Sequence, residues 1–225
     1  AYTWAHLRNN NIPSSVLSQS RFDERNFFNK TVDVKKLYPV FEKLITTFEN
    51  NGYPFASVYL DSVEIRDHRI EASLTVNKGP LRRIDTVIIN EDAKITRSFI
   101  MQYLGLKQGM LYDESKIKNI SKRLRELSFL QESSPWRLEF NIAETKLYLF
   151  LKSKSANRAD VLIGLLPNNT ERQGKFLLTG DVKLAFANAL GIGELLSINW
   201  QNLQYQSPRY NLDFQLPYLL NTPIG

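Results

Sequence analysis

The sequence predicts an α+β chain in which two modules of order β-α-α-β-β precede the first strands of an antiparallel transmembrane β-barrel. Two observations lead to this fold class. The first two thirds of the 225 residues show the same order of helical and alternating segments twice, and residues 176–216 alternate between apolar and polar side chains in three successive segments. We therefore divide the chain into a first module at 1–79, a second module at 80–155 and barrel strands at 156–225.

The first module is predicted from one helical pattern and one hairpin. Two alternating runs, Ser57–Ile65 and Arg69–Asn77, are joined by a turn at 66–68. Aligning this module with the second adds a strand at Tyr2–Arg8 and a short helix at Ser14–Leu17. The apolar residues that share one face of the main helix are Leu37, Val40, Phe41, Leu44, Ile45 and Phe48.

The second module shows the full order directly, beginning with its own first strand. We expect a strand at Arg83–Ile89, a helix at Thr96–Leu104 and a second helix after Asp113, a residue type that favours the N-cap position. That second helix carries apolar residues at helical spacing, namely Ile117, Ile120, Leu124 and Leu127. The closing hairpin alternates through Trp136, Leu138, Phe140 and Ile142 and returns through Leu147, Leu149 and Leu151.

The last third of the chain is predicted to be a meander of antiparallel strands, each with one apolar and one wet face. Its wet face carries Asp, Asn and Gln, which a small soluble sandwich, the competing fold, could not pair when buried. Gly191 and Gly193 are expected in a periplasmic hairpin turn, because no helix follows them to form a nucleotide loop. We expect an interfacial aromatic girdle at Trp200, Tyr205, Tyr210 and Tyr218. The side chains expected to face lipid are Phe176, Leu178, Val182, Leu184, Phe186, Ile198, Trp200, Leu212 and Phe214.

Composition excludes several classes of protein. No stretch approaches the about 18 consecutive apolar residues of a membrane helix, and the absence of cysteine excludes disulfides and thiolate metal sites. The chain begins at Ala1 and stops at Gly225 without a closing strand, so we expect it to be part of a longer protein.

The net charge of +6 lies entirely before the barrel segment. From Ala156 onward there are five basic and five acidic residues, which leaves 24 basic and 18 acidic residues before that point. Part of the excess falls on the second helix of the second module, as a solvated face or as a contact with anionic membrane lipid, at Lys116, Lys118, Lys122, Arg123 and Arg125. We expect no nucleic-acid partner, because no aromatic stacking pattern accompanies this charge.

No chemistry-bearing constellation is expected to be a catalytic or metal site. Glu64, Asp67, His68 and Glu71 flank a tight turn, where charged side chains are solvated and do not converge on one ion. His6 lies on a predicted strand with no carboxylate or nucleophile near it in sequence. The prediction is therefore no enzyme activity, no metal and no cofactor.

The second module resembles a POTRA domain, the polypeptide-transport-associated module of outer-membrane assembly proteins. In the first module, residues 51–56 resemble the element that closes the second helix of a preceding POTRA repeat. Two such modules running into alternating strands at Ala159 are similar to the BamA-like family, in which POTRA domains precede a barrel of the bacterial surface antigen type. The residues that carry the resemblance of the second module are Gly79, Pro80, Ile84, Val87, Ile89, Ile95, Phe99, Ile100, Leu104, Gly105, Leu106, Gly109, Tyr112, Ile117, Ile120, Leu124, Leu127 and Phe129.

This resemblance implies a non-enzymatic function in the assembly and insertion of outer-membrane β-barrel proteins. The implied location is the bacterial outer membrane, with the POTRA domains in the periplasm. The implied partners are unfolded outer-membrane proteins, outer-membrane lipid and accessory periplasmic lipoproteins. Two alternatives stay open: a secretion pore of the same superfamily dedicated to one substrate, and a membrane anchor for an upstream hydrolase.

The resemblance also implies where substrate would bind. In POTRA folds the strand after the second helix lies at the sheet edge, where an extended segment can add through main-chain hydrogen bonds. The edge residues are then Val58, Tyr59, Leu60, Asp61 and Val63 in the first module and Arg137, Leu138, Glu139 and Phe140 in the second. The first barrel strand would form a seam with Ala159, Asp160, Val161, Leu162, Ile163 and Gly164.

Overall fold

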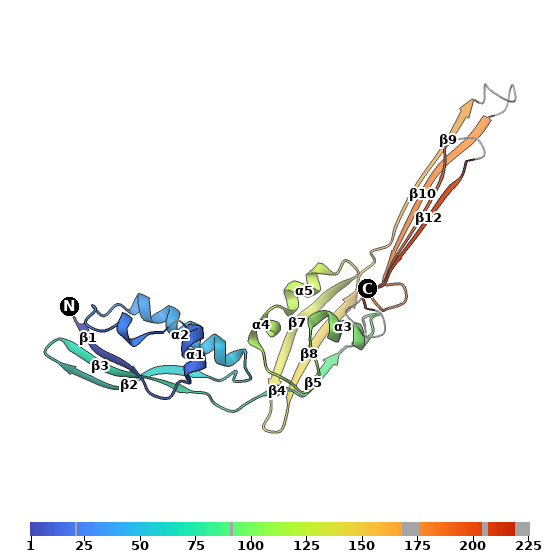
Figure 1. Cartoon of the computed structure of the whole chain (residues 1–225). Helices are drawn as coiled ribbons and strands as arrows, with labels where there is room; N and C mark the ends of the chain where they lie inside the picture. The colour runs from blue at the N-terminus through green and yellow to red at the C-terminus, as the bar shows by residue number, and fades with distance from the viewer. Residues whose placement is uncertain (21, 91, 168–175, 204–206, 219–225) are drawn as a thin grey trace. The chain divides into compact units, whose positions relative to one another are not determined.

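The computed structural model describes residues 1–225 except 21, 91, 168–175, 204–206 and 219–225 (Figure 1). By its internal contacts the chain divides into two compact units, one of residues 1–86, 108–118 and 139–146, the other of residues 87–107, 119–138 and 147–225. The second module contributes segments to both units, and the division at 79 and 155 stays a prediction. Among the described residues, no helix is long and apolar enough to cross a membrane.

The first module has the predicted helix and hairpin. Its three-stranded sheet has the order β1-β3-β2, with β1 parallel and β2 antiparallel to β3, and α1 and α2 lie over one face of it (Figure 1). The bounds are β1 Thr3–Asn9, α1 Ser14–Ser20, the 3-10 helix η1 Glu24–Asn26, α2 Val34–Glu49, β2 Ser57–Arg66 and β3 Arg69–Asn77.

The core of the first module lies between these helices and the sheet. Asp33 caps α2 by accepting the N–H of Lys35, so the helix begins where its apolar stripe begins. Leu37, Leu44 and Phe48 of that stripe are buried. The buried residues that form this core are Trp4, Leu7, Ile12, Phe22, Phe27, Leu37, Leu44, Phe48, Ala72, Leu74 and Val76.

The second module follows the predicted order with a three-stranded sheet of order β5-β8-β7 and a small β4-β6 pair. The bounds are β4 Arg83–Ile84, β5 Thr86–Ile89, α3 Arg97–Leu104, β6 Met110–Leu111, α4 Glu114–Lys118, α5 Ile120–Glu126, β7 Leu130–Phe140 and β8 Thr145–Ser153. Asp113 precedes α4 and accepts the N–H of Lys116, as a residue at the N-cap does.

Three details of the second module differ from the prediction. The strand predicted at 83–89 is interrupted at Asp85, because the N–H and the carboxylate of Asp85 both bond the backbone of Thr145. The second helix is divided at Asn119 into α4 and α5. Ile142 does not continue β7 but lies fully exposed in a turn, which the N–H of Asn141 closes by donating to the carbonyl of Glu144.

The end of α2 is bonded directly to the start of α4, within the first compact unit. The Asn50 side-chain oxygen Oδ1 accepts the backbone N–H of Ser115 at 2.9 Å and the Ser115 hydroxyl at 3.0 Å. Nearby, the rings of Phe55 and Phe140 meet edge to face with centroids 4.8 Å apart. The end of the first sequence repeat is therefore hydrogen-bonded to a helix of the second repeat.

The last four strands form an antiparallel meander in the order β12-β11-β10-β9, as predicted (Figure 1). The bounds are β9 Arg158–Pro167, β10 Phe176–Ala187, β11 Leu195–Asn202 and β12 Arg209–Gln215. Among the described residues neither outer strand pairs with a further strand, so this sheet is open on both sides.

Candidate functional site: sheet edges and an apolar strand face

Strand β2 lies at the edge of the first module's sheet, where the sequence placed a substrate-binding edge. Val58 and Leu60 pack against the core, whereas the Tyr59 side chain is 45% exposed. The pairing with β3 slips between Asp61 and Glu64, and Ser62 has a positive φ of 51°. This β-bulge at Ser62 and Val63 was not predicted. Since bulges interrupt the regular edge that an added strand needs, the continuous part of this edge is 57–61.

Strand β7 lies at the edge of the second module's sheet, and it already contains Pro135, which edge strands tolerate. Of the predicted edge residues, Arg137 lies over the ring of Tyr148 at 4.7 Å. The ring of Phe140 packs against Tyr112 with centroids 5.8 Å apart. Leu138 and Glu139 are half-buried. Some side chains of this edge therefore already contact other residues of the chain. An added segment would bind mainly through main-chain hydrogen bonds.

Strand β9 pairs with β10 on one side and with no described strand on the other. Its predicted seam residues, Ala159 to Gly164, all lie within the strand. Val161, Leu162 and Ile163 are 60%, 69% and 68% exposed, respectively. Among the residues that the structure describes, one edge of β9 therefore keeps open main-chain groups.

The nine residues predicted to face lipid share one face of the meander. The cross-strand register aligns them in rows. One row runs Val161, Val182, Trp200 and Tyr210, and the next runs Ala159, Leu184, Ile198 and Leu212. Phe186, Leu196 and Phe214 form a third row. These rows make one continuous apolar face.

This apolar face is largely uncovered by other parts of the chain. Phe176, Leu178, Leu212 and Phe214 are between 53% and 73% exposed. Trp200 lies across Gly180, where an added Cβ would be 2.7 Å from the indole ring. An apolar face of this kind is unfavourable in water and favourable in lipid.

The opposite face of the meander is polar. One row aligns Asp160, Lys183, Asn199 and Asn211. In the neighbouring row, the Gln201 side-chain amide donates to its cross-strand partner Asp181 at 3.0 Å, and Lys183 pairs with the same carboxylate at 3.5 Å. The alternation seen in the sequence is therefore a division into two faces of one sheet.

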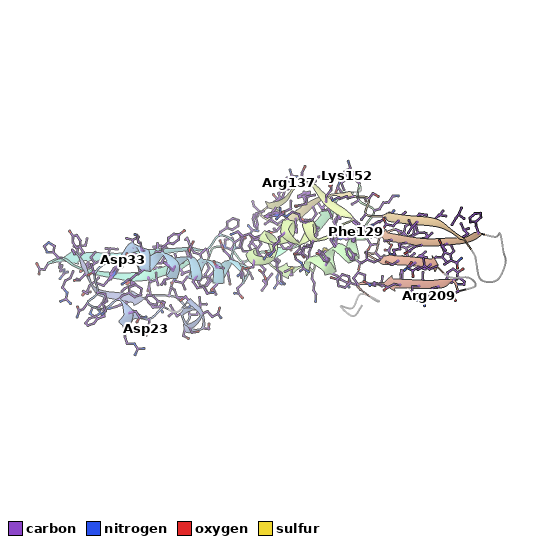
Figure 2. All side chains as sticks on the ribbon, turned by 90° about the horizontal axis from the view of Figure 1, so that it is seen from above. Asp23, Asp33, Phe129, Arg137, Lys152 and Arg209 are labelled. Atoms are coloured by element: carbon purple, nitrogen blue, oxygen red, sulfur yellow. The ribbon has the colours of Figure 1, made fainter. Side chains whose placement is uncertain are left out.

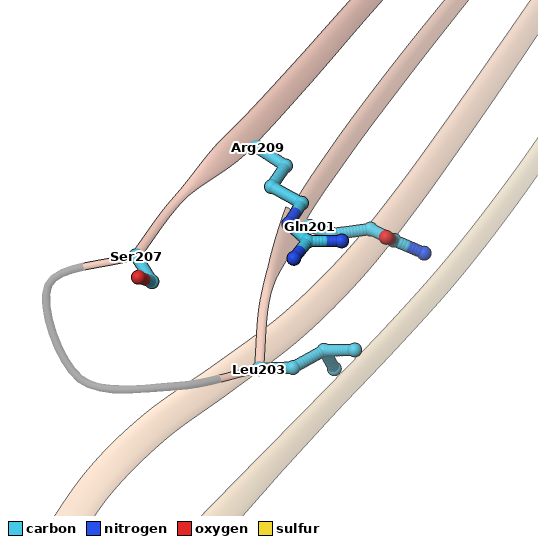
Figure 3. A pocket seen from close by; sticks show the side chains of 4 residues that line it. All are labelled: Gln201, Leu203, Ser207 and Arg209. Atoms are coloured by element: carbon cyan, nitrogen blue, oxygen red, sulfur yellow. The ribbon is translucent and has the colours of Figure 1, made fainter.

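A small open pocket lies at the Gln201 end of the polar face (Figure 3). It is lined by Gln201, Leu203, Ser207 and Arg209 and has a volume of about 160 Å³. Pockets for small molecules and cofactors usually measure about 300–1,000 Å³. We assign no ligand to this pocket.

The basic residues of α4 and α5 are mostly matched within the chain. Lys118 pairs with Glu114 at 2.9 Å, and Lys116 approaches Asp113 at 3.9 Å. Arg123 lies over the ring of Tyr103 at 4.8 Å. These contacts favour the solvated-face interpretation of this helix over a dedicated lipid contact.

One charged residue that sequence reasoning missed is Glu194, which lies in the turn between β10 and β11 and is only 2% exposed. Its carboxylate accepts the backbone N–H groups of Leu190 at 2.6 Å and Ile192 at 3.3 Å. The predicted turn at Gly191 and Gly193 is confirmed, and both glycines have positive φ. The sequence signal for a buried glutamate was its position directly after two closely spaced glycines and directly before an apolar strand.

For one residue of the predicted aromatic girdle, Tyr218, the structure differs from the prediction. Its ring meets Phe99 of α3 edge to face, with centroids 5.6 Å apart, so it packs on the second module and does not stand free at a strand end. Tyr205, another predicted girdle residue, lies outside the described residues.

Comparison with known proteins gives structural matches only. No family model matches the sequence, and no curated protein matches it. BamA from Haemophilus ducreyi lacking POTRA domains 1–3 superposes with a TM-score of 0.65 at 14% identity, covering 98% of this chain and 41% of that chain. CdiB from Acinetobacter baumannii superposes with a TM-score of 0.52 at 14% identity, covering 96% of this chain and 42% of that one.

These matches cover both modules and the meander together. The chain spans about two fifths of the length of the two proteins that it matches. The order of two β-α-α-β-β modules and an antiparallel meander is thus the order found in a solved BamA. The chain has the fold of BamA-like outer-membrane proteins, with two POTRA modules followed by the first strands of an antiparallel barrel.

Proposed function

We propose that this chain is part of a bacterial outer-membrane protein that folds and inserts other β-barrel proteins. The modules would lie in the periplasm, and strands β9 to β12 would lie in the outer membrane. The observation that carries the proposal is the meander that follows the two modules, whose apolar face is largely uncovered among the described residues.

The physical work in this proposal is templating and involves no covalent chemistry. Backbone N–H and C=O groups cannot enter lipid unpaired, so an incoming strand needs partners at every stage. The open edge of β9 would offer such partners at Ala159 to Gly164. Lipid would cover the apolar face.

The module edges would hold substrate before it reaches β9. An unfolded barrel segment would add to β2 at 57–61 or to β7 through main-chain bonds, which tolerate differences in side chains. Such tolerance suits a factor that handles many unfolded outer-membrane proteins. Accessory periplasmic lipoproteins are a further class of partner in this proposal.

Site-directed cross-linking tests the proposal, and no cysteine within these 225 residues competes with the introduced ones. Single cysteines replace Val161 or Ile163 in β9, and Ile198 in the central strand β11 serves as a matched apolar-face control. The full-length protein is reconstituted in lipid vesicles and given an unfolded barrel protein with one cysteine in its terminal strand.

We expect disulfide cross-links from the β9 positions and none from Ile198, because β11 already has partners on both sides. Folding of the substrate is followed in parallel by its resistance to protease. Transport of substrate into the vesicles without β9 cross-links would favour a secretion pore. The absence of both folding and transport would favour a membrane anchor.

A further inference from the structure

The turn between β10 and β11, residues 188–194, is bonded to the start of α3. The backbone N–H of Thr96 donates to the carbonyl of Gly191 at 2.7 Å. The Asn188 side-chain amide donates to the carbonyl of Lys94, also at 2.7 Å. All of these residues belong to the second compact unit. Two short hydrogen bonds thus join a barrel hairpin to the second module.

The ring of Phe99 packs over the same turn at a position that only glycine can occupy. A Cβ added at Gly193 would lie 2.1 Å from the nearest ring atom of Phe99, and Gly193 has a φ of 79°. Phe99 is 5% exposed, and it also packs against Phe129 and Tyr218 with centroids 6.1 and 5.6 Å away. The aromatic cluster is therefore built partly from the module and partly from the region of the meander.

The turn also holds its own shape through side chains that point inward. Glu194 accepts two N–H groups of the turn, and among the described residues it forms no ion pair. Asn188, at a φ of 57°, accepts the N–H of Gly193 at 2.9 Å while it donates to Lys94. A buried carboxylate is costly unless its oxygens are hydrogen-bonded. Its presence here indicates a turn whose backbone is fixed in one conformation.

The covalent link between the module and the meander is hydrogen-bonded as well. Residues 154–157 lead from β8 to β9, with the N–H of Lys154 bonded to Phe129 at 2.9 Å and Asn157 accepting the N–H of Ala187 at 3.3 Å. This link leads into β9 and, through Asn157, also contacts the last residue of β10, whereas the turn joins β10 to β11.

We propose that turn 188–194 is a docking element that fixes α3, and with it the part of the second module that lies in the second compact unit, to the β10–β11 hairpin, so that this part and the hairpin move as one body. Reorientation of the module would then be transmitted to β10 and β11, while the outer edge of β9 keeps its main-chain groups open. This inference goes beyond the proposed function, because it holds equally for an assembly factor, a pore or an anchor.

Distance measurement between two spin labels tests this coupling in the full-length protein in lipid nanodiscs. Lys152→Cys places one label on β8, and Arg209→Cys places the other on β12; both side chains are exposed (Figure 2). The protein with the native turn should give one narrow distance distribution. Gly193→Ala should widen that distribution about twofold or more, because the methyl group displaces the Phe99 ring and undocks the turn.

Gly109→Ala is the matched control, since Gly109 has a similar φ of 74° but an added Cβ would meet nothing within 4 Å. It carries the same backbone strain without the clash, and the distribution should stay narrow.

Asn188→Gly is a second, independent variant. It removes the bridge to Lys94 while glycine tolerates the positive φ, so it decides the question if Gly193→Ala does not fold. Distributions in Gly193→Ala or Asn188→Gly as narrow as in Gly109→Ala would overturn the proposal.

Discussion

Strand β3 of the first module and strand β10 of the meander are both central strands with alternating apolar residues, yet their apolar faces meet different surroundings. Ala72, Leu74 and Val76 on β3 are at most 4% exposed, because helices and loops of the module cover them. Phe176 and Leu178 on β10 are 72% and 56% exposed. Period-two alternation therefore specifies which face is apolar, and only the accompanying elements specify what covers it.

The largest expected effect is a charge placed on the covered face. Leu74→Arg puts a cation in a fully buried site with no partner, and we expect a loss of more than about 4 kcal/mol, enough to unfold the first module. Hydrogen exchange of β1 to β3 amides measures this. Ser73→Arg is the control on the opposite face, where Asp61 is its cross-strand neighbour. If the first module of Leu74→Arg stays folded, the stated difference between the apolar faces of β3 and β10 is contradicted.

A charge placed on the uncovered face should lower the stability of the protein only when lipid covers that face. Leu184→Arg should cost about 2–4 kcal/mol of barrel stability in a bilayer. Lys183→Leu, one position along on the polar face, should cost less. Urea titration of the protein in lipid vesicles measures both, and equal costs would contradict the assignment of the lipid face.

Smaller effects are expected at the module edges, where neither face is altered. Asp61→Pro and Glu139→Pro each remove one main-chain donor from an edge strand, so the modules should stay folded. Affinity for an unfolded barrel peptide should fall roughly two- to tenfold, the value of about one hydrogen bond. NMR titration measures the affinity. Asp61→Asn and Glu139→Gln keep the main-chain donor and serve as controls; unchanged affinity in both folded proline variants would move the substrate site away from the edges.

The smallest expected effect concerns Glu49, at the end of α2. Partial burial, and then the nearby Glu114 carboxylate, raise the pKa of Glu49, although Lys118 opposes this. Because its pKa is higher in the folded chain, stability is favoured at acid pH and declines as the pH rises through the pKa of the folded state. Glu49→Gln should therefore stabilise the chain slightly at pH 7 and make no difference near pH 3. Thermal unfolding at the two values measures this, and a stabilisation that is equal at both would contradict the ionic cause.

The elements that the sequence predicted best are those in which burial and period agree. The helix at 34–49 follows from its apolar stripe and from Asp33, and the meander follows from three alternating runs. The break at Asp85 could not be predicted, because the apolar residues Ile84 and Val87 on either side of it, both buried, fit one continuous strand. The bulge at Ser62 had a sequence signal that was missed, since the apolar positions change phase from Val58 and Leu60 to Val63 and Ile65 across it.

The candidate sites likewise include some that the sequence predicted and one contact that it did not. Edge and seam strands follow from topology, and the structure places β2, β7 and β9 at sheet edges. The docking of turn 188–194 could not be predicted, because its hydrogen bond to Lys94 joins residues 94 positions apart. Neither residue type is diagnostic alone; the contact depends on a turn conformation that two glycines and Asn188 make accessible.

The bond between Asn50 and Ser115 affects how the chain can be divided and in what order it matures. The residue that ends the last helix of one repeat satisfies the first turn of a helix in the next, so a module cut out at residue 80 would begin α4 with two donors exposed. Asp113 would still cap α4, and the loss of the two hydrogen bonds to Asn50 would cost on the order of 1 kcal/mol, a large share of the stability of so small a domain. During synthesis from the N-terminus, α2 is complete before Ser115 emerges. The boundary at residue 80 is therefore a boundary of the sequence repeat and not of the hydrogen bonding.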